Sequence, residues 1–185
     1  MAHRDYRADL DGLRAISIAS VVLYHYGFEI VPGGFIGVDV FFVISGFLIT
    51  SIIHRDLRSG SFTILGFYDR RIRRILPALM ALLIACVVAG YYVLSPGDYR
   101  ELGAQIAYSA PGFGNFYFLW NTGYFDQTAD LLPLLNLWSL GVEEQFYLLW
   151  PLILAALVAK AKLPRNGLIG VLAALVLLSL CFAEY

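Results

Sequence analysis

The chain has 185 residues, of which 59% are hydrophobic and only 15% are charged, and its formal net charge is −1. A soluble domain carries roughly 45–50% apolar and about 25% charged residues, so this composition excludes an ordinary water-soluble globular domain. The mean hydropathy of +0.71 and the long uncharged runs instead indicate membrane spans, which need about 20 predominantly apolar residues each.

Five apolar runs predict five membrane spans. In chain order they are residues 15–31, 35–53, 75–94, 138–159 and 168–183. Lys and Arg accumulate in cytoplasmic loops, and twelve of the thirteen basic residues lie before the first run, between the second and third, or between the fourth and fifth. We therefore predict an all-α, polytopic membrane helical bundle of about five transmembrane helices with its N-terminus in the cytoplasm.

The longer segments between the runs are placed by the same charge bias. Residues 54–76 are expected to form a substantial cytoplasmic loop, whose second half alternates basic and apolar residues as a segment along the membrane surface does. Residues 96–137 are expected to begin and end outside. Within them, the aromatic stretch 106–120 is interrupted by Pro111 and Gly112, and we predict an interfacial or re-entrant helix there.

The first run contains a histidine at a depth where ionisable residues are expensive. His25 follows Arg14 by eleven residues, which is about 1100° of helical rotation and a rise of about 16 Å, so both lie on one helix face. We expect Arg14 at the cytoplasmic mouth, His25 past the membrane midplane, and Glu29 one turn further, within reach of the imidazole. His25 is either a general base, since imidazole exchanges protons near neutral pH, or a packing contact. Glu29 is alternatively an interfacial residue.

The second run contains a single charge, Asp39. Its carboxylate either lines the same site as His25 or starts the helix after Gly37, because acidic residues are favoured at helix N-termini. In the same run, Ser45 and Gly46 are small enough to allow close packing against another helix.

Four arginines lie within five residues beside the third run, at positions 70, 71, 73 and 74. Such a cluster sets membrane topology and attracts anionic lipids. It is also typical of a site for a phosphorylated molecule, because guanidinium forks match phosphate oxygens. Arg71 and Arg74 are about one helical turn apart and can clamp one group. The charge pattern alone leaves both interpretations open.

The fourth run contains two adjacent glutamates, Glu143 and Glu144. Counted back from Lys160 at about 1.5 Å per residue, they lie about 24–26 Å above the cytoplasmic end, near the depth predicted for His25. A carboxylate and an imidazole at one depth can form an acid–base pair. Adjacent helical residues diverge by about 100°, so at most one glutamate meets a given partner. The alternative is an interfacial pair beside the anchoring tryptophans at 138 and 150.

Four segments together resemble the type-3 membrane acyltransferases, the bacterial O-acetyltransferases that modify cell-surface polysaccharides. They are "LDGLRAISIASVVLYH" (10–25), "GGFIGVDVFFVISGFLIT" (33–50), "FYDRRIRRILPAL" (67–79) and "LNLWSLGVEEQFYLLWP" (135–151). The resemblance covers residues 10 to about 151. Because members of this family have more spans, we expect residues 1–185 to be the N-terminal part of a membrane acyltransferase domain, truncated within the fifth span.

The resemblance implies roles for particular residues. The family's motifs fall on Arg14 and His25, on Arg71 and Arg74, and on Trp138, Ser139, Glu143 and Gln145. We expect His25 to be catalytic, with Glu143 or Glu144 orienting or charge-balancing its imidazole. The residues expected to bind the phosphates of the donor are Arg14, Arg71 and Arg74. The residues expected to line the cavity are Asp39, Trp138, Ser139 and Gln145.

The resemblance also implies the substrates. The donor is acyl-CoA, usually acetyl-CoA, on the cytoplasmic side, and the acceptor is a glycan hydroxyl outside the membrane, in O-antigen, peptidoglycan or exopolysaccharide. His25 either activates that hydroxyl or transiently carries the acyl group. We expect a multi-pass acyltransferase of the inner (plasma) membrane, surrounded by the lipid bilayer, with neither a metal ion nor a nucleic acid as partner. The alternatives are a polytopic transporter and an inactive truncated membrane protein.

Overall fold

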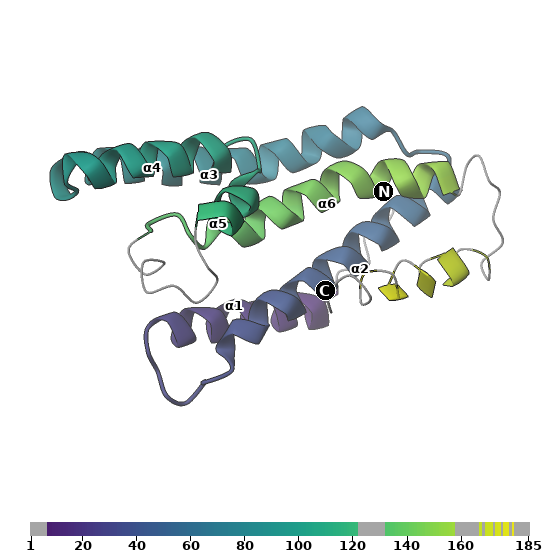
Figure 1. The fold of residues 1–185 in the computed structure, drawn as a ribbon. Coiled ribbons are helices and arrows are strands. Elements are labelled where there is room, and N and C mark those ends of the chain that lie inside the picture. The colour runs from purple at the N-terminus through teal and green to yellow at the C-terminus, as the bar shows by residue number, and fades with distance from the viewer. Residues whose placement is uncertain are drawn as a thin grey trace.

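The computed structural model describes residues 7–121, 132–157, 167, 169–171, 173–174, 176–177 and 179. Within these residues the secondary structure consists of helices joined by turns, with no strand (Figure 1). The helices are α1 (Ala8–His25), the 3-10 helix η1 (Gly34–Ile36), α2 (Gly37–Arg58), α3 (Ile64–Val93), α4 (Pro96–Ser109), α5 (Gly114–Asn121) and α6 (Leu137–Ala155). The all-α prediction is therefore confirmed for the described part of the chain.

Three long helices form the frame of the structure. Figure 1 shows α6 between α2 and α3, with α1 beside one half of α2 and α4 running back along α3. Helices α2 and α6 run in the same direction, because Trp138 contacts Phe42 near their beginnings and Trp150 donates a hydrogen bond to Thr50 (2.8 Å) further along. The functional residues predicted on separate segments thus lie on helices that pack together.

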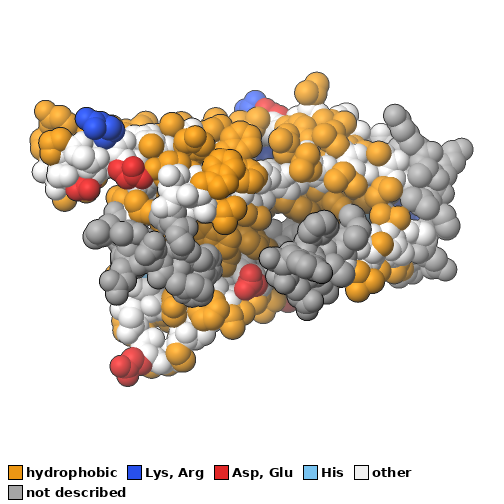
Figure 2. Space-filling model, in the orientation of Figure 1, with side chains coloured by type: hydrophobic (Ala, Val, Ile, Leu, Met, Phe, Trp, Pro, Cys, Tyr) orange, Lys and Arg blue, Asp and Glu red, His pale blue; other side chains and the backbone are white. Residues whose placement is uncertain are grey.

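Two described segments, Gly34–Arg58 and Ile64–Val93, are long and apolar enough to cross a membrane, with mean hydropathies of 2.3 and 2.2. Their outward-facing side chains are apolar, as at Val43 (73% exposed) and Ile84 (62% exposed). Apolar side chains also dominate the face shown in Figure 2. In contrast, α1 and α6 contain charged residues, which lower their hydropathy, so five spans stay a prediction.

The first expected span, 15–31, differs from the observed helix. Helix α1 ends at His25 because Gly27 adopts a φ of 73° and the Phe28 N–H donates to the Leu23 carbonyl (3.1 Å), a pattern that closes helices. Glu29 lies beyond this turn. The prediction that Glu29 continues the helix face of His25 is therefore wrong.

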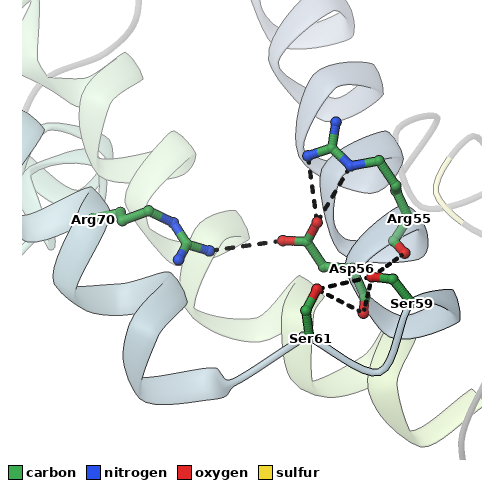
Figure 3. Close-up of polar contacts among 5 residues, drawn as sticks. All are labelled: Arg55, Asp56, Ser59, Ser61 and Arg70. Atoms are coloured by element: carbon green, nitrogen blue, oxygen red, sulfur yellow. Dashed lines mark hydrogen bonds and ion pairs between the residues drawn. The ribbon is translucent and has the colours of Figure 1, made fainter. Parts of the chain in front are cut away.

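The predicted cytoplasmic loop 54–76 is wrong as a loop, because only residues 59–63 connect α2 to α3. Figure 3 shows how Asp56 fixes this connection. The Asp56 carbonyl accepts the N–H groups of Ser61 (3.0 Å) and Phe62 (3.1 Å), and its carboxylate lies 3.9 Å from Arg70 on α3. The arginine-rich segment is helical and continues through Pro77 into the apolar part of α3.

The predicted helix 106–120 is two helices instead of one. Helix α4 is capped by Ser95, whose hydroxyl accepts the Asp98 N–H (3.3 Å), and it ends at Ser109. Gly112 then adopts a φ of 83° before α5 begins. Pro111 and Gly112, which suggested a re-entrant turn, thus mark a corner between α4 and α5.

The structure describes only part of the fifth predicted span, and it leaves out the end of the fourth run and a segment before it. Within 168–183, the described residues 169–171, 173–174, 176–177 and 179 are helical. The remaining residues of that run, the end of the fourth run at 158–159, and residues 122–131 lie outside the described residues.

Helix α1 packs closely against two glycines, Gly34 at the start of η1 and Gly37 at the start of α2. A Cβ atom on Gly34 would lie 2.2 Å from the Ser20 carbonyl oxygen, and one on Gly37 would lie 2.4 Å from the Ser17 carbonyl oxygen. Both contacts are with backbone atoms, which cannot rotate away. The small residues of this segment therefore set the distance between α1 and α2.

We expect Gly37→Ala to destabilise the protein by about 1–3 kcal/mol, the usual cost of forcing an extra group into a packed interface. Gly12→Ala is the matched control, because Gly12 is also helical but a Cβ there meets nothing within 4 Å. Alanine favours helices, so the control should be neutral or stabilising. Thermal unfolding of the detergent-solubilised protein measures both, and equal stability of the two variants would contradict the close packing.

Candidate functional site

A partly buried polar cluster lies where α2, α3 and α6 meet. Its centre is Tyr147 on α6, which is 7% exposed. The Tyr147 hydroxyl donates a hydrogen bond to the Glu143 carboxylate one turn earlier, and Ser45 on α2 lies within hydrogen-bonding reach of the same hydroxyl. The Arg71 guanidinium on α3 lies over the Tyr147 ring, 4.9 Å from its centroid, and 5.6 Å from the centroid of Phe67.

Arg14 joins this cluster from α1. Its guanidinium lies 5.1 Å from the centroid of the Phe41 ring on α2, and Arg14 and Glu143 are both within electrostatic range of Arg71. The Arg14 side chain is 22% exposed, and its Nε is buried without a hydrogen-bond partner among the described residues. The structure thus brings together three residues that the sequence predicts for the site, from three different helices.

The depth of Arg14 differs from the prediction. Phe41 is near the start of α2, and Arg58 at the other end lies about 25 Å further along the axis. Arg14 therefore lies beside the Gly37 half of α2, whereas the sequence predicts it at the mouth formed by the arginine-rich ends of α2 and α3. The difference arises because α1 ends at His25 and not at residue 31, so that Arg14 lies only about 16 Å from the end of α1 that turns towards α2.

His25 is the last residue of α1 and is exposed. Its ring makes an edge-to-face contact with Tyr24 (centroids 5.6 Å apart), which packs on Phe35. Because α1 is continuous from Arg14 to His25, the two residues are about 16 Å apart along one helix, as the spacing predicts. The structure does not bring His25 to Glu143: in the described part of the chain, His25 pairs with no carboxylate.

The two adjacent glutamates face different neighbours. Glu143 faces Tyr147 and Arg71, whereas Glu144 packs against Gly112 at the α4–α5 corner, where its Oε2 would lie 2.5 Å from an added Cβ. This divergence agrees with the expectation that at most one glutamate meets a given partner. Glu143 therefore belongs to the polar cluster, and Glu144 belongs to the corner.

The same corner is held by Gln145. Its Nε2 donates to the Gly112 carbonyl (2.9 Å) and to Asn115 Oδ1 (2.7 Å), while Asn115 Nδ2 donates back to Gln145 Oε1 (3.4 Å). Gln145 thus attaches the α4–α5 corner to α6. Sequence analysis did not identify Asn115, since a lone asparagine in an aromatic segment gives no signal of its partner.

The other predicted cavity residues have structural neighbours. Trp138 makes an edge-to-face contact with Phe42 (6.3 Å), and Ser139 donates to the Asn136 carbonyl (3.0 Å). Asp39 is exposed in the first turn of α2. This position fits the helix-start interpretation, because a carboxylate is favourable at a helix N-terminus.

A half-open pocket of about 160 Å³ lies between α2 and α6 beside the polar cluster. Its walls are Phe42, Ser45, Gly46, Val142, Glu143 and Phe146. The pocket surface is almost entirely apolar, although Ser45 and Glu143 are among the residues that line it. Small-molecule sites are typically apolar concavities with a few placed polar groups, and this one is of a size for a small group.

Sequence analysis identified the charges of the cluster but not the tyrosine that joins them. Tyr147 lies four residues after Glu143, and such i, i+4 residues meet on one helix face. That spacing is visible in the sequence. Its contacts with Ser45 and Arg71 are tertiary and depend on how α2, α3 and α6 pack.

The fold and the site define a helical protein in which Arg71 of α3 meets Tyr147 and Glu143 of α6. Comparison with known proteins identifies its family. The acyltransferase domain family matches residues 7–185. The chain therefore belongs to the type-3 membrane acyltransferase family, as the four segments in the sequence suggested.

Individual relatives have more specific names. The chain is 38% identical over 164 residues to the peptidoglycan O-acetyltransferase OatA of Listeria monocytogenes, covering 88% of this chain and 26% of the relative. It is 40% identical over 167 residues to the O-acetyltransferase OatA of Staphylococcus aureus (87% and 26%) and 41% identical over 187 residues to the putative peptidoglycan O-acetyltransferase YrhL of Bacillus subtilis (96% and 28%). The chain spans about a quarter of the length of these relatives, and no solved structure matches it.

Proposed function

We propose that this protein acts in a membrane-embedded acyltransferase that moves an acyl group, an acetyl group by analogy with its relatives, from acyl-CoA to a hydroxyl of an extracytoplasmic glycan. Peptidoglycan is the proposed acceptor, because two of the relatives described above are named for it. The observation that carries this proposal is the half-buried Arg71 guanidinium within electrostatic range of Glu143 and Arg14, close to a pocket for a small group.

The donor is assigned to the arginines. Within the described residues Arg71 forms no ion pair, so its N–H groups stay available to an anionic ligand. Arg74 is exposed one turn away and can meet the same ligand. Phosphate groups suit guanidinium donors, and acyl-CoA carries phosphates at its nucleotide end and its thioester at the other end of a long, thin arm.

The acceptor is assigned to the other end of α1. We place the N-terminus of α1 on the cytoplasmic side and His25 towards the outside, in a multi-pass arrangement of about five spans in the plasma membrane. The two apolar segments and the basic residues at the shared end of α2 and α3 support this orientation. The thioester would then cross much of the ~16 Å between Arg14 and His25.

In the proposed reaction the His25 imidazole takes the proton from the glycan hydroxyl as its oxygen attacks the thioester carbonyl carbon. The carbon–sulfur bond breaks, and the CoA thiolate leaves and takes the proton from the imidazolium. Alternatively the acyl group first moves to a nitrogen of His25 and then to the hydroxyl. The contacts of Glu143 favour a role in balancing the charge of Arg71 over a role at His25.

The experiment that tests the proposal uses the full-length protein, purified and reconstituted in lipid, with acetyl-CoA and soluble peptidoglycan fragments. We expect release of the free CoA thiol together with base-labile acetate on the glycan. The rival function, a transporter, predicts exchange of a solute across the membrane without CoA. Solute counterflow in the absence of thiol release would overturn the acyltransferase proposal.

A further inference from the structure

We infer that Tyr147 is a positioning residue of the acyl transfer: its hydroxyl holds the Glu143 carboxylate, and its ring holds the Arg71 guanidinium. This inference rests on the proposed function and goes beyond it, because Tyr147 lies within the family-like segment 135–151 but has no role among the residues predicted for the site. Tyr147 would act through Glu143 and Arg71 without touching the reacting atoms.

The first observation is the separation of two opposite charges. Arg71 and Glu143 lie within electrostatic range of each other inside the bundle. Two such groups commonly close an ion pair, which would occupy both. Within the described residues they do not: the Glu143 carboxylate accepts the Tyr147 hydroxyl, and the Arg71 guanidinium lies over the Tyr147 ring. The tyrosine therefore keeps the charges close while leaving the edge of the guanidinium open.

The second observation is that Tyr147 itself is held in place from several helices. It is buried, its hydroxyl reaches towards Ser45 on α2, and its neighbours in the core include Ile49 on α2 and Phe67 on α3. A buried side chain in a packed core occupies one rotamer. The packing of α2, α3 and α6 therefore fixes the position of Tyr147, and Tyr147 in turn fixes the positions of the Glu143 carboxylate and the Arg71 guanidinium.

The third observation is the place of this network at the pocket. Glu143 and Ser45, the two groups next to the Tyr147 hydroxyl, also line the 160 Å³ pocket between α2 and α6. A shift of the hydroxyl would move the side chain of Glu143, a residue of the pocket wall, and a loss of the ring would release Arg71. The two parts of one side chain thus have separable functions.

Two substitutions separate these functions in the full-length, lipid-reconstituted protein with acetyl-CoA as the donor. Tyr147→Phe keeps the ring under Arg71 and removes the hydroxyl. We expect kcat to fall about tenfold, as for the loss of a hydrogen bond to a charged group. The KM for acetyl-CoA should stay within about twofold of the wild type, since the cation–π contact remains. Tyr147→Leu removes both contacts, and its KM for acetyl-CoA should rise about tenfold as well.

The control is Tyr68→Phe, which also removes a tyrosine hydroxyl, here one that bonds across from α3 to the Leu148 carbonyl on α6 (2.7 Å). It should leave both kinetic parameters near those of the wild type. If Tyr147→Phe and Tyr147→Leu change kcat and KM to the same extent, and the loss of activity follows the loss of folded protein, Tyr147 is only structural. The inference then fails. A wild-type protein that releases no CoA would instead overturn the proposed function, and the Tyr147 assignment with it.

Discussion

Replacing His25 with alanine in the full-length protein is expected to abolish glycan acylation, with a loss of at least about 10²-fold, as for removal of a general base. Folding and membrane insertion should persist, because His25 is exposed at the end of α1 and its ring contact is with the neighbouring Tyr24. The measurement is base-labile acetate on purified peptidoglycan from cells that express the variant alone, with membrane protein quantified in parallel.

His54→Ala is the matched control for this prediction. His54 lies near the opposite end of the bundle on α2 and is partly buried, so its loss should leave acylation near the wild-type level. Wild-type acylation by the His25 variant would refute a catalytic role. Incubating the wild-type protein with donor and no acceptor, followed by mass spectrometry, separates the two mechanisms, since only the carrier mechanism places an acyl group on His25.

The sequence predicted the helices well where a single local signal was sufficient. Apolar runs located the bodies of α2, α3 and α6, and the spacing from Arg14 to His25 predicted that they share one helix. The boundaries failed where local signals competed. The arginines before Pro77 suggested a loop, yet residues 64–76 are the first turns of α3, because a helix can carry charged side chains on turns that need not lie among lipid tails.

For the candidate site, the sequence predicted which charged residues take part but not which of them are in contact. Arg71 and Glu143 were visible as ionisable residues in apolar surroundings, where they are functional candidates by default. Their meeting was not visible, because it depends on α2 and α6 running in the same direction with α3 beside them. The expected meeting of His25 with Glu143 rested on depth alone. Depth does not specify which helix faces are in contact. In the structure, the Glu143 carboxylate accepts a hydrogen bond from Tyr147 instead.

Removing Arg71 and Arg74 together is expected to weaken the binding of acetyl-CoA by at least about tenfold, because charge-assisted hydrogen bonds to phosphate are the strongest polar contacts available here. Arg71 should account for most of the loss, since it is held on two aromatic rings, whereas Arg74 is exposed. Direct binding of labelled acetyl-CoA to the full-length protein in nanodiscs measures the effect without depending on turnover.

The same helix offers a control that removes an equal charge. Arg70 lies 3.9 Å from Asp56, and Arg73 lies 2.9 Å from Asp69, so both already have partners, and both are exposed. Exposed ion pairs contribute little, about 0–1 kcal/mol each, so Arg70→Ala with Arg73→Ala should fold and bind acetyl-CoA as the wild type does. If both double variants weaken binding equally, the arginines act through general positive charge at the membrane surface. A loss confined to Arg71 and Arg74 would mean that the donor binds specifically to these two arginines, the members of the 70–74 cluster that form no ion pair within the described residues.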